Sequence, residues 1–139
     1  MEFKHLVTSL FFTLYFLSLV GCNSSERGEN KIVDLAFTDA TLKACIRANA
    51  SKKGWQKVSE MITLNCDKEV YPNIGDPTGI EQLDHLQELT IENSRFRRID
   101  LANLDQLTHL QLVNHQLREI DLSNQTLLTE LNLGLPRVY

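Results

Sequence analysis

The sequence predicts an α/β solenoid, with a parallel sheet on its concave side and a small helical unit over its N-terminal end. Two observations lead to this fold class. Residues 86–133 overlay on themselves in steps of 21, and residues 32–50 place apolar side chains at the steps of three and four that are typical of a helix. A fixed period of this size indicates stacked coils, none of which can bury its apolar face alone.

Nine positions of the first copy recur in the second, with only apolar-for-apolar changes. The first copy is Leu86, Leu89, Ile91, Asn93, Phe96, Ile99, Asp100, Leu101 and Asn103; the second is Leu107, Leu110, Leu112, Asn114, Leu117, Ile120, Asp121, Leu122 and Asn124; a third begins with Leu128, Leu131 and Leu133. This pattern resembles the leucine-rich repeat in the short form of bacterial surface proteins such as internalins. The resemblance covers residues 61–133 and implies a fold and a style of binding, but no ligand.

Each coil is expected to contribute one short strand whose Leu and Ile side chains point into the core, so the alternate side chains point out. The predicted concave face consists of Glu88, Thr90, Glu92, His109, Gln111, Val113, Glu130, Asn132 and Gly134, with Ser94 and His115 as the next outward positions. We expect this face to bind another protein or, alternatively, a glycan. Asn93 and Asn114 are expected to turn inward and bond to the backbone, and Asp100 and Asp121 to serve turns.

The sequence contains no nucleophile elbow, phosphate loop or metal-ligand motif, so we expect no enzyme activity, no cofactor and no metal. A metal site built on His109 and His115 with the neighbouring glutamates is disfavoured, because their spacing matches no ligand motif. A solvated turn is favoured for Arg95, Arg97 and Arg98 over contact with an anionic glycan or lipid headgroup. The net charge of −4 and the pI of about 5.5 argue against nucleic-acid binding.

Residues 1–21 are predicted to be an export signal. Lys4 gives a basic start, and residues 6–20 form an uncharged apolar run, short for a membrane span of about 20 residues. The run ends in Leu19-Val20-Gly21-Cys22, which resembles the bacterial lipoprotein signal. The resemblance implies that Cys22 carries acyl chains and anchors the exported chain to a membrane of the bacterial cell envelope, on the outer-membrane or periplasmic side. The alternative is a membrane anchor that stays uncleaved.

The rest of the chain divides by composition. Residues 22–31 are polar and are expected to form a flexible tether. Residues 32–66 are expected to form the helical cap and run into the first strand, with Thr38 or Asp39 at the start of the helix and Gly54 at its end. Residues 67–85 hold several Pro and Gly residues and should complete a first coil of 25 residues, and residues 86–139 hold the repeats, the last incomplete.

Cys45 and Cys66 are predicted to form a disulfide. Cys45 lies on the apolar face of the predicted helix, and Leu64 and Cys66, two apart on a strand, should both face inward. If Cys22 is acylated, these are the two thiols left, and an exported protein meets an oxidising compartment. The alternative is a pair of buried free thiols.

The C-terminal end departs from the repeat, because Leu135 falls where Asn93 and Asn114 stand in the earlier copies. Leu127, Leu128, Leu131 and Leu133 are therefore expected to leave an apolar edge beside an unpaired strand. Two interpretations follow: a truncated product of a longer gene, or an edge that pairs with another copy or partner in a structural or assembly role.

Overall fold

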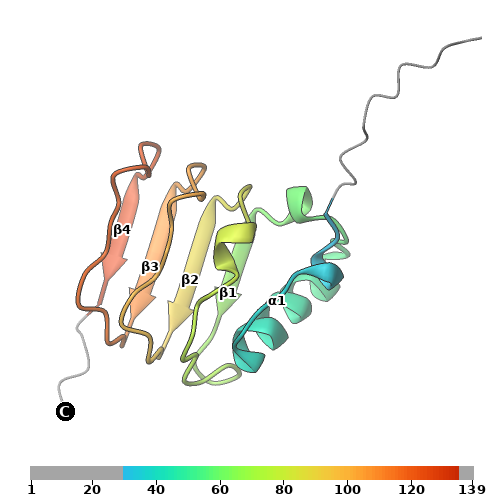
Figure 1. The fold of residues 1–139 in the computed structure, drawn as a ribbon, viewed down its shortest axis with the longest axis horizontal. Helices are drawn as coiled ribbons and strands as arrows, with labels where there is room; N and C mark the ends of the chain where they lie inside the picture. The colour runs from blue at the N-terminus through green and yellow to red at the C-terminus, as the bar shows by residue number, and fades with distance from the viewer. Residues whose placement is uncertain (1–29, 135–139) are drawn as a thin grey trace, which may run out of the picture.

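The computed structural model describes residues 30–134. The predicted export signal, Cys22 and most of the predicted tether lie outside these residues, as do the last five positions. Four parallel strands, β1 (Thr63–Cys66), β2 (Glu88–Glu92), β3 (His109–Val113) and β4 (Glu130–Leu133), form one sheet in the order β1-β2-β3-β4 (Figure 1). The predicted solenoid with a helical unit at its N-terminal end is confirmed. Among residues 30–134, no helix is long and apolar enough to cross a membrane.

The helical unit consists of α1 (Ala40–Lys53), which lies at the β1 end of the sheet (Figure 1). Its first turn is capped by the Asp39 carboxylate, which accepts hydrogen bonds from the N–H groups of Thr41 and Leu42 at 2.7 and 2.9 Å. Its end falls at Gly54, whose φ of 74° few other residue types adopt. Three short 3₁₀ helices, η1 (Ile32–Asp34), η2 (Val58–Glu60) and η3 (Ile80–Gln82), complete the regular structure of the described chain.

Asp39 also ties the cap to the first coil. Its second carboxylate oxygen accepts hydrogen bonds from the N–H groups of Gly75 and Asp76 at 2.8 and 3.3 Å. Burial raises the pKa of Asp39, but the four backbone N–H groups stabilise the charged form more strongly, and the pKa is lowered. The loop of residues 67–85 is thereby fixed against the start of α1.

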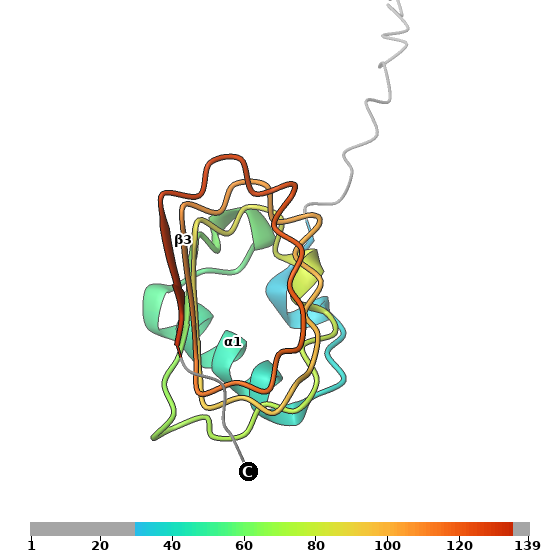
Figure 2. The same ribbon diagram turned by 90° about the vertical axis from the view of Figure 1, so that its left-hand side faces the viewer.

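The strands stack with their repeat positions in register. Leu64 pairs with Leu89, 25 positions later, and the next step, from Leu89 to Leu110, is 21, so the first coil is longer as predicted. Leu64, Leu89 and Leu110 are each 1% exposed, which confirms their inward direction. Viewed along the solenoid axis, successive coils superpose with the sheet on one side (Figure 2).

Polar side chains also link the coils at the 21-residue step. The hydroxyls of Thr108 and Thr129 donate to the carbonyls of Gln87 and Thr108, each at 3.1 Å. The same two carbonyls also accept hydrogen bonds from backbone N–H groups one coil later, so the hydroxyls add a side-chain bond to an existing backbone link. The matched positions therefore include polar groups that the apolar pattern alone does not reveal.

The turns that follow β2 and β3 correct one prediction. Ser94 and His115, expected to face outward, are buried, with 0% and 6% of their surface exposed. Asn93 and Asn114, expected to turn inward, are half-buried. Their backbones adopt the left-handed conformation, with φ values of 63° and 53°. Asn tolerates this left-handed conformation better than most residues. It turns the chain so that the following residue, and not the Asn, points into the core.

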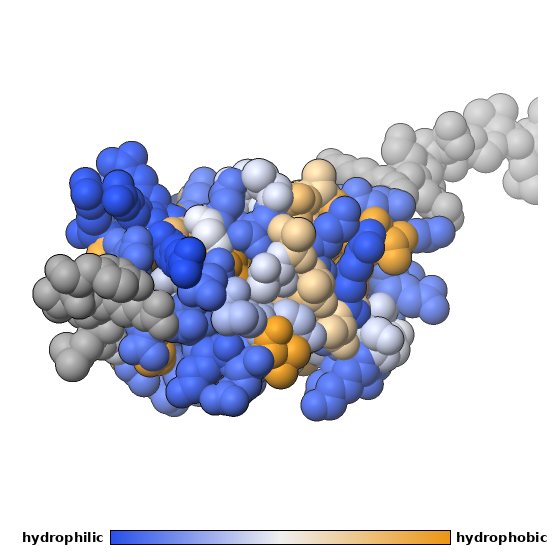
Figure 3. Space-filling model, turned by 90° about the horizontal axis from the view of Figure 1, so that it is seen from below, coloured by the Kyte–Doolittle hydropathy of each residue, from blue (hydrophilic) through white to orange (hydrophobic). Residues whose placement is uncertain are grey.

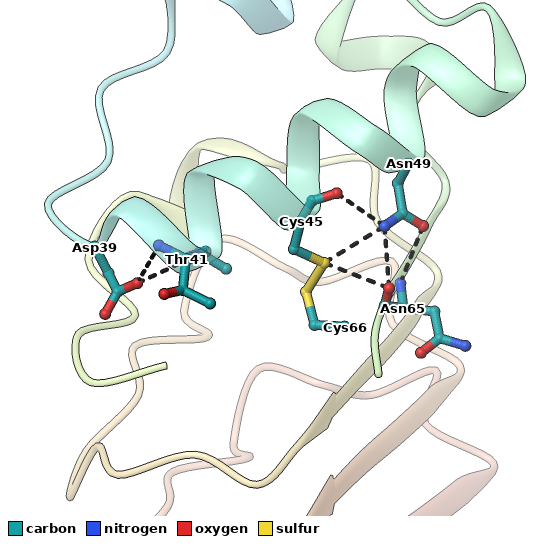
Figure 4. Close-up of a disulfide and its surroundings, with 7 residues drawn as sticks. Asp39, Thr41, Cys45, Asn49, Asn65 and Cys66 are labelled. Carbon is teal, nitrogen blue, oxygen red and sulfur yellow. Dashed lines mark hydrogen bonds between the residues drawn. A yellow bond between two sulfur atoms is a disulfide. The ribbon is translucent and has the colours of Figure 1, made fainter. Parts of the chain in front are cut away.

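The predicted disulfide is present. Cys45 on α1 is bonded to Cys66 on β1, and both residues are fully buried (Figure 4). The Asn49 amide donates to the carbonyls of Cys45 and Asn65 at 2.9 and 3.0 Å, beside the sulfur atoms. Helix and first strand are therefore joined both covalently and by hydrogen bonds.

The coil that contains β4 is the least buried of the described chain. Leu127, Leu131 and Leu133 are 49%, 47% and 39% exposed, and Leu128 is half-buried. Within residues 30–134, β4 pairs with β3 alone. The predicted apolar edge is thus present in the described part of the chain.

Candidate binding face

The outward side chains of β1–β4 form one surface, which we call the strand face. From each strand two or three side chains reach it, because inward and outward positions alternate. Its members are Thr63, Asn65, Glu88, Thr90, Glu92, His109, Gln111, Val113, Glu130 and Asn132. All of them are exposed or half-buried, whereas the alternate residues of β1, β2 and β3 are buried. The strand face includes the predicted outward positions of β2, β3 and β4 except Gly134, which follows the end of β4.

The row nearest the start of the strands carries most of the charge. Thr63, Glu88, His109 and Glu130 are neighbours in the sheet register. The His109 Nε2 atom lies 3.6 Å from a Glu130 carboxylate oxygen, so the two side chains form an ion pair when His109 is protonated. With Glu92 at the end of β2, the strand face carries three glutamates and no Lys or Arg.

The middle row contains only uncharged hydrogen-bonding groups. Asn65, Thr90, Gln111 and Asn132 are register neighbours, so successive strands present them about 4.8 Å apart. Amide and hydroxyl groups both donate and accept hydrogen bonds. The row can therefore bind the polar groups of a ligand without requiring a charge on it.

His115 is buried and does not belong to the strand face, whereas His109 is exposed on it. Within residues 30–134, no group of three or more His, Cys, Asp and Glu side chains is placed to hold a metal ion.

The arginines next to Phe96 are exposed. Arg95 donates to the Asn73 side chain at 3.0 Å, and Arg98 pairs with Glu119 at 2.8 Å.

The side of the molecule at which the strands end is largely hydrophilic, with small separate hydrophobic patches (Figure 3).

Asp100 and Asp121 lie in turns, as predicted. Their carboxylates accept hydrogen bonds from the N–H groups of Ala102 and Ser123, each at 2.9 Å. The hydrogen bonds from Ser123 lower the pKa of Asp121. These hydrogen bonds show that both aspartates stabilise local turns.

A separate polar groove of about 930 Å³ lies before the start of the strands. It is lined from successive coils by residues that include Gln82, His85, Gln87, Asn103 and Gln106. On its rim His85 Nδ1 lies 2.8 Å from the exposed Asp84 carboxylate. The groove is a second candidate surface, which the sequence did not reveal because its residues come from the cap and from two different coils.

Two further features were missed from the sequence. Thr63 and Asn65 extend the strand face onto β1, as the alternation of Leu64 and Cys66 could have indicated. Gln125 occupies the buried position of Leu104 in the preceding coil, and its amide donates to the carbonyl of Leu101 at 2.6 Å. The step of 21 places Gln125 on Leu104, so the signal was available.

The stacked coils, the single parallel sheet and the helical unit at one end define a solenoid of the leucine-rich repeat type. No known family model and no curated protein matches the sequence. Among solved structures, the chain is similar to one titled "Functional domain of InlJ from Listeria monocytogenes includes a cysteine ladder", with a TM-score of 0.60 and 24% sequence identity. The match covers 74% of this chain and 23% of that chain, so the present chain spans under a quarter of its length.

Proposed function

We propose that this protein is a binding module that recognises another protein through the strand face. The observation that supports this most directly is the contrast between the two sides of the sheet. The inward side chains of β1, β2 and β3 are almost fully buried, while the outward ones, all polar except Val113, form one surface across all four strands. Polar side chains held on a rigid sheet lose little entropy on binding, which favours recognition.

The charge of the strand face favours a partner with basic groups. Three glutamates and no Lys or Arg reach this surface, and the whole chain carries a net charge of −4. Complementary charge accelerates encounter and rejects like-charged partners. The uncharged middle row would then supply the hydrogen bonds that fix the orientation of the bound partner.

Site-specific photo-cross-linking in the cells that express the chain tests this proposal. A photoreactive residue at Gln111, in the centre of the strand face, should capture a protein partner, whereas one at Gln106, in the polar groove, should not. Capture from Gln106 and not from Gln111 would show that the groove is the binding surface. A captured glycan in place of a protein would favour the alternative ligand class.

The captured partner then allows the face to be tested by substitution. Glu92→Arg combined with Gln111→Ala should weaken binding and leave thermal stability nearly unchanged, because both side chains are outward. The matched control is Asp105→Arg with Gln106→Ala, which makes the same types of change on the rim of the groove. Equal affinity of the protein with and without the strand-face changes would contradict the proposal.

We further propose that the module is exported and anchored to a membrane through acyl chains on Cys22. The support is the sequence of residues 1–22, and each buried methylene of an acyl chain would contribute about 0.8 kcal/mol to anchoring. Cys22→Ser should abolish incorporation of labelled palmitate and release the protein from the membrane fraction. Unchanged labelling in this variant would exclude Cys22 as the acylated residue.

An assembly role is the second candidate, and the exposed edge of β4 favours it. Leu131 and Leu133 are 47% and 39% exposed beside an edge that no described strand pairs, an arrangement that can add a further strand. Analytical ultracentrifugation over a range of concentrations tests this. Self-association that Leu131→Lys abolishes would support the assembly role, and a strict monomer would count against pairing between copies.

A further inference from the structure

His115 occupies a special position in the turn after β3. It is 21 residues after Ser94, and both side chains point into the solenoid at the same place in successive coils. Within residues 30–134, the Ser94 hydroxyl and the His115 Nε2 atom are buried and make no hydrogen bond. Burying a polar ring whose Nε2 atom has no hydrogen-bond partner costs folding free energy. Neither the strand face nor the apolar core requires a histidine here.

The hydrogen bond that His115 does make fixes its protonation state. The backbone N–H of Leu117 donates to Nδ1 of His115 at 3.1 Å. A ring nitrogen can accept a hydrogen bond only when it carries no proton, so the neutral ring holds its proton on Nε2. A second proton would have to bind at Nδ1, where it would face the Leu117 N–H.

We propose that His115 makes the turn after β3 acid-sensitive: uptake of a proton from solvent by Nδ1 breaks the hydrogen bond from Leu117 and opens the turn. The imidazolium has two N–H donors and no acceptor. In the buried position Nε2 finds no acceptor, and Nδ1 faces another donor. Both donors are satisfied if the ring swings out to water, and residues 113–117 must move to allow it.

The charged groups around the ring do not offset this cost. Arg95, Arg97 and Arg98 on the preceding turn, and Arg118 and Glu119 on its own turn, are all exposed. Arg95 bonds to Asn73, and Arg98 pairs with Glu119. Neither these side chains nor Glu92 at the end of β2 alters the titration of His115; burial alone lowers its pKa.

The direction and window of the effect follow from linkage. Above about pH 6.5, the usual pKa of His, the ring is neutral in the closed and the open turn, and the closed turn carries no penalty. Below that pH the open turn binds the proton first, because the closed turn has the lower pKa. The equilibrium constant for opening should therefore rise by up to about tenfold per pH unit, until the pH reaches the lowered pKa of the closed state.

Amide hydrogen exchange of the full chain, purified in detergent, tests the proposal. The protection factor of the Leu117 amide, corrected for the intrinsic pH dependence of exchange, should fall by up to about tenfold between pH 7.5 and pH 5.5. In His115→Ser, which copies the residue of the preceding coil, it should be lower but independent of pH. In the control His85→Gln, which removes an exposed histidine, it should fall as in the wild type.

The ring resonances of the wild type provide a second measurement that needs no variant. The His115 Cε1–H signal should titrate below pH 6.5, and the Leu117 amide signal should change along the same curve. A pH-independent protection factor in the wild type, a retained pH dependence in His115→Ser, or titration of His115 without any response at Leu117 would each overturn the proposal.

Discussion

Leu110→Ala should destabilise the protein by about 2–5 kcal/mol. Leu110 is 1% exposed and lies on β3 between Leu89 and Leu131 in the sheet register. The change removes three carbon groups, each worth about 0.8 kcal/mol of transfer free energy. A cavity between two neighbouring coils adds to this loss, because the sheet on both sides prevents the site from collapsing. A cost of about 3–4 kcal/mol is therefore expected.

Leu131→Ala is the matched control, because it makes the same change at the same repeat position one strand further on. Leu131 is 47% exposed, so about half of the transfer term is lost and little cavity forms; a cost of about 1 kcal/mol is expected. Urea unfolding of the oxidised protein, with comparable m values, measures both variants. Equal costs for the two variants would refute the reasoning and show that Leu131 is covered in solution.

Three further predictions concern the cap and the turns. Cys45→Ala with Cys66→Ala opens a loop of 21 residues and should cost about 3 kcal/mol by the chain-entropy estimate; chemical denaturation under matched redox conditions measures it. Asp39→Ala should cost about 1 kcal/mol at pH 7, and the difference from wild type should shrink as the pH falls through the lowered pKa of Asp39, since the charged form makes the stronger cap. Asn114→Val should destabilise the protein by about 1–2 kcal/mol, because a β-branched residue is strained at this positive φ. Asn114→Gly should keep a stability close to that of the wild type, and thermal unfolding measures both variants.

The apolar period was sufficient to predict the fold, the inward strand positions and the longer first coil. A step of 21 with conserved apolar character permits one arrangement in which every coil buries the same face against its neighbour. The disulfide was also predictable, because a helix face and a strand face each have a defined direction. Cys45 and Cys66 both faced the core, and two buried thiols on adjacent elements of a chain that we predicted to be exported were expected to meet.

The prediction for Ser94 and His115 failed for a specific physical reason. We extended the inward and outward alternation of side chains two residues past the ends of β2 and β3, although it holds only while the backbone stays extended. Asn93 and Asn114 adopt positive φ and reverse the direction of the next side chain. The two asparagines were the visible signal, but their types suggest inward amide bonds as readily as a left-handed turn. The burial of a polar residue such as His115 cannot be predicted from the period of the apolar residues.

Burial decreases along the solenoid axis, and this gradient has a consequence for the proposed function. Ile99, Leu101 and Leu107 are 8%, 1% and 0% exposed, whereas their equivalents one coil later, Ile120, Leu122 and Leu128, are only half-buried. In a solenoid the stability of a coil depends on its own contacts and on its neighbours, so the coil of β4 has the smallest share of core and β1, next to α1, is covalently secured. Openings should therefore begin at β4 and spread toward β3. Glu130 and Asn132 lie on the strand that opens most easily, so we expect the part of the strand face on β4 to gain the most order when a partner binds.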